Sequence, residues 1–183
     1  MPVFIAMLRG VNLGPHKRMK MEKLRSSCEA LRLEQVKTYI QSGNVVFRAA
    51  KQDPASLAKK MEDRIVQDFG FSSKVVIRTA DQMSRVIRNN PLLRRTGVDA
   101  DKLHVTFLPL VPAAAAIKKL NMLPQQDDQF CCVKAEVYLY CPNGLGQCKL
   151  PNNFFEKHLA AGGTTRNWRT VNTLYSMAQE CGD

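Results

Sequence analysis

The most constraining feature of this sequence is its first predicted strand, which is apolar on both sides. Residues 2–8 are rich in β-forming residues and contain no charged side chain. Successive side chains of a strand point to opposite faces of a sheet. Here one face carries Val3, Ile5 and Met7 and the other carries Phe4, Ala6 and Leu8. A sheet built around such a strand needs cover on both faces, so the N-terminal half is not expected to be stable alone.

The predicted strands and helices follow the same order twice. Hydrophobic spacing and turn residues predict strand 2–8, helix 21–31, strands 36–41 and 45–48, helix 54–69 and strand 74–79. After a helix at 81–89 and a polar loop at 91–101 come strand 103–107, helix 112–122, strands 130–133 and 137–140, helix 152–161, strand 164–168 and a C-terminal helix. This order is typical of the ferredoxin-like fold. The sequence thus predicts an α+β protein with two tandem ferredoxin-like βαββαβ-type halves packed together, residues 1–80 and 81–183, with no residue-level repeat between them.

The charge of the chain indicates the class of partner. There are 27 Lys and Arg residues against 16 Asp and Glu residues, which gives a net charge of +11. Such an excess favours anionic partners, either nucleic acid or small phosphorylated ligands. No basic run is longer than a pair such as Lys17-Arg18, so the charge is not gathered into a nucleic-acid-binding arm. A solubilising surface is the alternative explanation.

Neither a membrane segment nor an export signal is predicted, because the apolar run at residues 3–8 is too short for either. We therefore expect a cytoplasmic protein whose six cysteines are reduced thiols. There is no Cys-x-x-Cys, and Cys141, Cys148 and His158 have irregular spacing, so neither a metal nor another cofactor is predicted. Cys141 and Cys148 flank a glycine-rich loop and are the exceptions most open to thiol chemistry.

The segment after the first strand has the character of an anion site. It contains Arg9, Gly10, Asn12 and Gly14, followed by Lys17, Arg18 and Lys20. Because it leads from a strand into a helix, its backbone N–H groups and cations are suited to a phosphate or carboxylate. Neither the P-loop nor the dinucleotide-binding glycine spacing is present. The alternative is that the glycines form a turn and Asn12 hydrogen-bonds the backbone.

Polar side chains gather at two further places. Gln41 and Asn44 flank a predicted hairpin turn, where they either line a cleft or satisfy the turn itself. Arg166 is suited to a bidentate grip on an anion, Asn167 to orienting a ligand or capping the next helix, and Trp168 to the core. The predicted ligand-binding residues are Arg9, Asn12, Lys17, Arg18, Gln41, Asn44, Arg166 and Asn167.

Several segments resemble a known family. These are residues 8–14, Lys20-Met21, residues 38–47, residues 165–168 and Thr170-Val171, and they resemble the hallmark blocks of the bacterial family called domain of unknown function 1697. The resemblance covers most of the chain and implies an α+β fold of two ferredoxin-like halves, but no activity. One departure is Cys148-Lys149, where family members often carry Ser-Lys.

The sequence leaves open whether the protein is an enzyme, because His16, His104 and His158 lack neighbouring carboxylates that would indicate a catalytic pair. Two functions remain: nucleic-acid binding, and an enzyme or sensor for a small phosphorylated metabolite. An enclosed pocket that joins Arg9, Asn12 and Arg166 would favour the metabolite, and a basic stripe would favour nucleic acid. Base stacking of the RNA-recognition type is not expected, because the third strand offers only Phe47. A homo-oligomer that covers an apolar sheet face is a third alternative.

Overall fold

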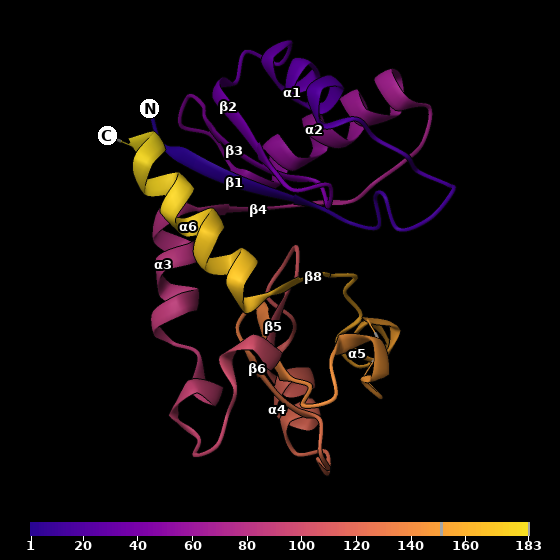
Figure 1. Cartoon of the computed structure of the whole chain (residues 1–183), viewed down its shortest axis with the longest axis vertical. Coiled ribbons are helices and arrows are strands. Elements are labelled where there is room, and N and C mark those ends of the chain that lie inside the picture. Colours follow the sequence, from indigo (N-terminus) through magenta and orange to yellow (C-terminus); the bar gives the residue numbers. More distant parts are fainter. Residues whose placement is uncertain (151, 183) are drawn as a thin grey trace. The chain divides into compact units, whose positions relative to one another are not determined.

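The computed structural model describes residues 1–150 and 152–182 and divides the chain into two compact units. Unit 1 comprises Met1–Ser84 with the C-terminal residues from Thr173, and unit 2 comprises Arg85–Asn172. Each unit contains a four-stranded antiparallel sheet with helices packed on it (Figure 1). The chain therefore has an α+β fold. No helix of the described residues is long and apolar enough to cross a membrane.

Unit 1 contains the first set of predicted elements. They are β1 (Val3–Leu8), α1 (Met21–Glu29), β2 (Glu34–Tyr39), β3 (Asn44–Arg48), α2 (Pro54–Phe69) and β4 (Val75–Thr79). The strand order is β2-β3-β1-β4, and α1 and α2 lie on one face of this sheet (Figure 1). The α2 helix begins as the sequence predicts, because the Asp53 side chain accepts a hydrogen bond from the Ser56 amide and Pro54 occupies the first turn. It ends at Gly70, whose φ of +74° allows the left-handed cap.

The prediction that β1 is buried on both faces is confirmed. All six of its residues are buried. Phe4, Ala6 and Leu8 belong to the hydrophobic core that includes residues of α1 and α2. On the opposite face, Ile5 and Met7 have no exposed surface. Residues of α3 (Ala80–Arg88) and α6 (Trp168–Gly182) contribute to unit 1 as well, and the Cys181 thiol lies 3.3 Å from the side-chain oxygen of Gln35.

Unit 2 follows the same order of elements. They are β5 (Leu103–Phe107), α4 (Ala114–Asn121), β6 (Gln129–Val133), β7 (Glu136–Tyr140), α5 (Asn152–Leu159) and β8 (Thr164–Asn167). The sheet order is β6-β7-β5-β8, which matches that of unit 1 strand for strand. Short 3-10 helices lie at Pro91–Arg94, Ala100–Lys102 and Leu145–Gln147. A separate core holds the sheet against α4 and α5, with Leu120, Phe130 and Phe155 among its buried members.

The two units also repeat at the level of single residues, which the sequence analysis did not find. In the last strand of each sheet, Arg78 pairs with Ile5 and Arg166 pairs with Val105, at equivalent positions of the central strand. Both arginines are buried, and each donates to the backbone oxygen of the residue before it, at 3.0 Å and 2.9 Å respectively. The next residue caps the following helix in both cases, since Thr79 Oγ1 and Asn167 Oδ1 accept from the backbone amide three residues on.

Candidate functional site

Three connecting segments meet at one end of the unit 1 sheet. The register places Met7 opposite Asn44 and Leu8 opposite Val75, so the end of β1 lies beside the starts of β3 and β4. The β1–α1 loop (residues 9–20), the β2–β3 turn (residues 40–43) and the segment before β4 (residues 70–74) therefore share this end. Backbone hydrogen bonds join them: the Leu8 amide donates to the Gly43 oxygen at 2.8 Å, and the Arg9 amide donates to the Lys74 oxygen at 2.9 Å.

Asn12 holds the β1–α1 loop in one shape. Its Nδ2 donates to the backbone oxygens of Met19, at 2.9 Å, and Gln41, at 2.8 Å. Its Oδ1 accepts from the Met19 amide at 2.7 Å. The Asn12 backbone is in the left-handed region with φ of +55°, which asparagine tolerates better than most residues. These bonds tie both ends of the loop to the β2–β3 turn, so the side chain of Asn12 positions the loop and its cations.

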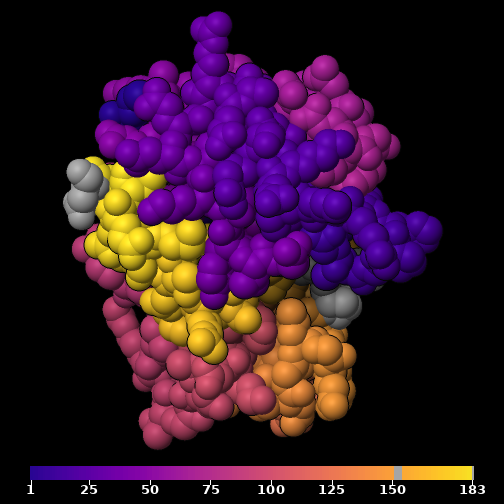
Figure 2. Space-filling view, turned by 45° about the horizontal axis from the view of Figure 1, so that its top comes forward, coloured from indigo at the N-terminus to yellow at the C-terminus, as the bar shows by residue number. Residues whose placement is uncertain are grey.

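A groove of about 1060 Å³ runs along this loop, here called the loop groove. Its lining includes Asn12, Leu13, Arg18, Lys20 and Gln41. The twelve residues of the loop carry four formal positive charges, on Arg9, Lys17, Arg18 and Lys20, and no negative charge. Lys17, Arg18 and Lys20 are exposed. Figure 2 shows the loop in indigo, projecting from the rest of unit 1 at the right of the view. The lining also includes the carboxylate of Glu22, at the start of α1. The loop groove is therefore open to solvent and carries an excess of positive charge, because Arg18 and Lys20 outweigh Glu22.

Apolar side chains are exposed next to these cations. Leu13 at the loop is 84% exposed, and Ile40 in the β2–β3 turn is 52% exposed. Exposed apolar groups beside cations are suited to a ligand that has both charge and flat apolar surface. Two aromatic residues of the unit 1 sheet, Phe4 and Phe47, do not offer such a surface, because they are buried under the helices, and Tyr39 on β2 is half-buried.

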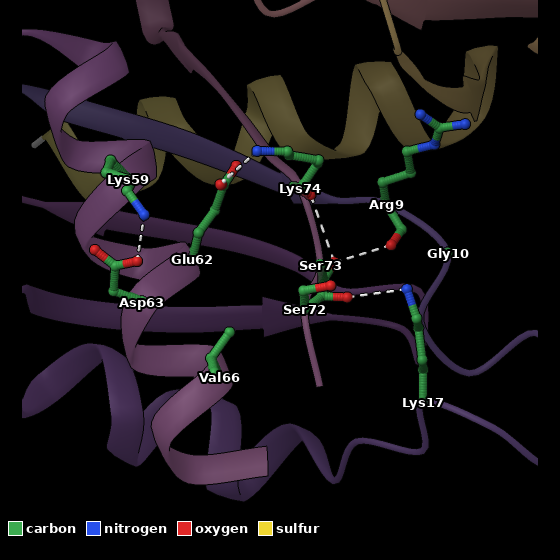
Figure 3. A pocket seen from close by; sticks show the side chains of 10 residues that line it. All are labelled: Arg9, Gly10, Lys17, Lys59, Glu62, Asp63, Val66, Ser72, Ser73 and Lys74. Carbon is green, nitrogen blue, oxygen red and sulfur yellow. Dashed lines mark hydrogen bonds and ion pairs between the residues drawn. The ribbon is translucent and has the colours of Figure 1, made fainter. Parts of the chain in front are cut away.

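A second cavity, of about 480 Å³, lies between the loop and α2 (Figure 3) and is here called the serine pocket. Its lining comprises Arg9, Gly10, Lys17, Lys59, Glu62, Asp63, Val66, Ser72, Ser73 and Lys74. Its cations have partners within it: Lys17 Nζ donates to the Ser72 backbone oxygen at 2.9 Å, Lys74 pairs with Glu62 at 3.0 Å, and Lys59 pairs with Asp63. Figure 3 shows the Arg9 guanidinium pointing away from the Lys59–Asp63 pair. Because Glu62 and Asp63 are paired with Lys74 and Lys59, these charges of the pocket are balanced. The pocket is therefore less favourable for an anion than the loop groove, where Arg18 and Lys20 outweigh Glu22.

The hairpin residues take different positions. Gln41 is exposed and lines the loop groove. Asn44 is fully buried, and its Nδ2 donates to Ser42 Oγ at 2.8 Å and to the Tyr39 backbone oxygen at 3.2 Å. Asn44 therefore holds the turn together.

Arg166 and Asn167 belong to unit 2. Arg166 is 8% exposed, and one of its guanidinium nitrogens donates to Thr164 Oγ1 at 2.7 Å. Burial lowers the pKa of Arg166 to about 10, so the side chain remains charged at neutral pH. Asn167 takes the capping role, one of the two roles predicted for it. Trp168 is half-buried, not enclosed in the core. A site that joins Arg166 to Arg9 and Asn12 stays a prediction.

We expect Arg166→Ala to lower the free energy of unfolding by about 2 kcal/mol, because the substitution removes the hydrogen bonds that the buried guanidinium donates to Thr164 Oγ1 and to the Thr165 backbone oxygen. Arg78→Ala is expected to have an effect of similar size, since Arg78 occupies the equivalent position. The measurement is urea unfolding monitored by circular dichroism, with Arg88→Ala, an exposed arginine of unit 2, as the control. If Arg166→Ala and Arg88→Ala have equal effects, Arg166 does not support the fold.

His104 on β5 is expected to make the stability of unit 2 depend on pH. It is 8% exposed, and burial lowers its pKa below the usual 6.5. The unfolded chain therefore takes up a proton at a higher pH than the folded chain. The contribution of His104 to the free energy of unfolding is fully present above about pH 6.5. It is lost as the pH falls below that value, by at most about 1.4 kcal/mol per pH unit. Urea unfolding from about pH 7 to about pH 5 checks this, and His104→Gln should flatten the profile. An unchanged profile in that variant would assign the pH dependence to other groups.

The fold brings together three side chains of unit 2 that the sequence analysis did not connect as a site. One oxygen of Asp128 and the sulfurs of Cys141 and Cys148 all lie within 4.8 Å of one another. The two sulfurs are 3.0 Å apart. The sequence suggested Cys141 and Cys148 as metal ligands only together with His158, a set rejected for its irregular spacing, and nothing in the sequence pointed to Asp128.

Comparisons with known proteins identify relatives of the chain. The model of a family described as "Protein of unknown function (DUF1697)" matches residues 1–138. A solved structure of the conserved bacterial protein SP0830 from Streptococcus pneumoniae is similar, with a TM-score of 0.74 and 20% sequence identity, over 97% of this chain and 98% of that chain. At this identity the likeness concerns the fold alone. Among curated proteins, none matches.

Proposed function

The chain belongs to the DUF1697 family of proteins of unknown function, and we propose that its loop groove binds single-stranded nucleic acid. The observation that carries this proposal is the charge of the β1–α1 loop, four positive side chains without a negative one. Phosphate contacts by lysine and arginine supply most of the affinity of non-specific nucleic-acid binding. Arg18 and Lys20 line the loop groove and are assigned to phosphate contacts. Lys17 lies on the same loop, at the side of the serine pocket, and its exposed ammonium is assigned to a phosphate that passes the edge of the groove.

The exposed apolar side chains favour a single strand over a duplex. Leu13 and Ile40 offer surfaces on which an unpaired base packs, and Gln41 offers hydrogen bonds to a base edge. The bases of a duplex are stacked on one another and do not present their faces. In this proposal the loop groove takes the role that aromatic residues of the sheet have in RNA-recognition domains.

The hydrogen bonds of Asn12 support the proposal because they lower the conformational entropy that the loop loses when a ligand binds. A flexible loop loses conformational entropy when it closes on a ligand, and a loop already held in shape loses less. Asn12 joins the loop to both Met19 and Gln41. The cations of the loop are therefore presented before the ligand arrives.

We also infer that each unit has a ferredoxin-like topology. The support is the βαββαβ order of elements, the β2-β3-β1-β4 order of the first sheet and the matching order of the second.

The second candidate function is binding of a small phosphorylated ligand in the serine pocket. Its volume of about 480 Å³ is in the range of small-molecule sites, and the exposed Ser72 and the ammonium of Lys17 line it. Ser73 lines it as well, but its hydroxyl donates to the Arg9 backbone oxygen at 2.8 Å. The carboxylates of the pocket balance two of its cations, so we place this candidate second.

The experiment that separates the two candidates measures fluorescence anisotropy of short labelled single-stranded RNA and DNA with the whole protein. We expect saturable binding, and we expect that an unlabelled strand competes whereas inorganic phosphate and a nucleoside monophosphate at equal phosphate concentration do not. Equal competition by the monophosphate, abolished by Ser72→Ala, would favour the serine pocket. No binding of either strand at low salt would contradict the proposal.

A further inference from the structure

The side-chain cluster of Asp128, Cys141 and Cys148 lies outside the proposed nucleic-acid site. Asp128 precedes β6, Cys141 follows β7, and Cys148 follows the short helix Leu145–Gln147, so three separate segments of unit 2 meet here. Cys141 is completely buried, and Cys148 and Asp128 are partly buried. A small cavity of about 180 Å³, lined by Asp128 and Gln147 among others, adjoins the cluster.

We propose that Asp128, Cys141 and Cys148 form a binding site for a thiophilic divalent cation, Zn²⁺ in the first place. Two sulfurs and one carboxylate oxygen are ligands that zinc takes in proteins. Calcium and magnesium prefer sites made of oxygen alone, so the two sulfurs argue against them. Three protein ligands leave the fourth position of a tetrahedral site to water, which the adjoining cavity admits.

The separation of the ligand atoms is close to that of a zinc site. With Zn–S of about 2.3 Å and Zn–O of about 2.0 Å, tetrahedral ligand atoms are about 3.5 to 3.8 Å from one another. The sulfurs, now 3.0 Å apart, have to separate by less than about 1 Å, and the carboxylate oxygen, within 4.8 Å of them, has to approach by at most about 1.3 Å. Gly144 and Gly146 lie in the loop between the two cysteines, and a side chain at either would meet no neighbouring atom within 4 Å. The loop therefore has room for this adjustment.

A hydrogen bond already orients the carboxylate. The backbone amide of Lys149 donates to Asp128 Oδ2 at 2.8 Å. Carboxylates that bind metal ions in proteins are commonly oriented by such a hydrogen bond from a neighbouring group. The position of Asp128 also favours a metal site over a redox-active cysteine pair, because a disulfide between Cys141 and Cys148 would not involve Asp128.

The test uses the whole protein, kept reduced with a phosphine, and Co²⁺ as the probe. Bound by two thiolates, Co²⁺ gives a sulfur-to-cobalt charge-transfer band in the near ultraviolet together with visible bands. We expect one equivalent to bind and one equivalent of Zn²⁺ to displace it. Cys141→Ser and Cys148→Ser should abolish the charge-transfer band or weaken the affinity by about 100-fold, and Asp128→Asn should weaken it by about 10-fold or more. Cys131→Ser, in neighbouring strand β6, is the matched control and should bind as the wild type does.

Circular dichroism of each variant establishes that it is folded, and Asp128→Asn keeps both thiols if the serine variants do not fold. The proposal is overturned if reduced wild-type protein gives no charge-transfer band, or if Cys131→Ser loses the band as well. It is overturned too if Co²⁺ does not bind and oxidised protein contains a Cys141–Cys148 disulfide, because the pair is then a redox pair.

Discussion

Gly43→Ala is expected to lower the free energy of unfolding by about 3 to 4 kcal/mol, the largest effect on stability that we predict for a single methyl group. Gly43 has φ of +72°, and a Cβ built on it would lie 2.7 Å from Leu8 Cβ and 2.7 Å from Val11 Cγ2. The left-handed backbone alone costs about 1 to 2 kcal/mol for alanine. The rest comes from overlap with buried atoms of β1 and of the loop that leaves it, which have little room to move.

Gly70→Ala is the matched control for this substitution. Gly70 has nearly the same backbone angle, φ of +74°, but a Cβ there would meet no atom within 4 Å. The difference between the two variants in urea unfolding isolates the close packing of the β2–β3 turn against β1. Equal losses for both would mean that the turn is not packed as described.

Replacing Lys17, Arg18 and Lys20 together by alanine is expected to weaken binding of single-stranded nucleic acid by about 100-fold at about 0.1 M salt. The reason is the loss of three phosphate contacts, each worth about a 5-fold change in affinity at this salt concentration. All three side chains are exposed, and the hydrogen bond from Lys17 Nζ to the Ser72 oxygen that is lost lies at the surface, so the fold should be unaffected. Anisotropy titration with a labelled strand measures the effect.

The control for the triple variant removes three cations elsewhere. Lys51, Lys60 and Lys119 are exposed and lie outside the β1–α1 loop, so their replacement by alanine changes the net charge by the same amount. If both triple variants lose affinity equally, binding depends on net charge alone, not on the loop.

The sequence predicted the order of the elements well because the hydrophobic spacing of each is set by burial in a local core. The double burial of β1 and the cap at Asp53 were both evident from residue type. The boundaries of β2 were predicted less accurately. It begins at Glu34, before the predicted start, because a bulge at Gln35, with φ of +49°, lets Glu34 pair with Arg48. It ends at Tyr39 because Ile40, with φ of +46°, begins the turn.

The residue-level repeat was missed because it is visible only in the register with which the last strand of each sheet pairs with the central strand. Arg78 and Arg166 have different neighbours in the sequence, and only the pairing with the central strand shows that they are equivalent. The same applies to Thr79 and Asn167, which cap helices through different chemical groups. A sequence comparison that scores identity gives little weight to such a pair.

The candidate site was predicted in part. The loop cations follow one another in the sequence, so their shared surface could be expected. The role of Asn12 depends on Met19 and Gln41, and the distant partner, Gln41, is set by the pairing of β1 with β3. The cluster around Cys141 could not be predicted, because Asp128 reaches it only when β6 pairs with β7, and Cys148 only through the turn and short helix that follow β7.

The central claim is that the β1–α1 loop contacts phosphates, and the dependence of binding on salt tests it most directly. Log affinity for a single strand should fall linearly with log salt, by about 0.7 for each phosphate contacted. For the Lys17, Arg18 and Lys20 triple variant the account predicts a slope shallower by about 2, with the Lys51, Lys60 and Lys119 variant keeping the wild-type slope. A wild-type slope near zero, or the same slope in the loop variant as in the wild type, would contradict it.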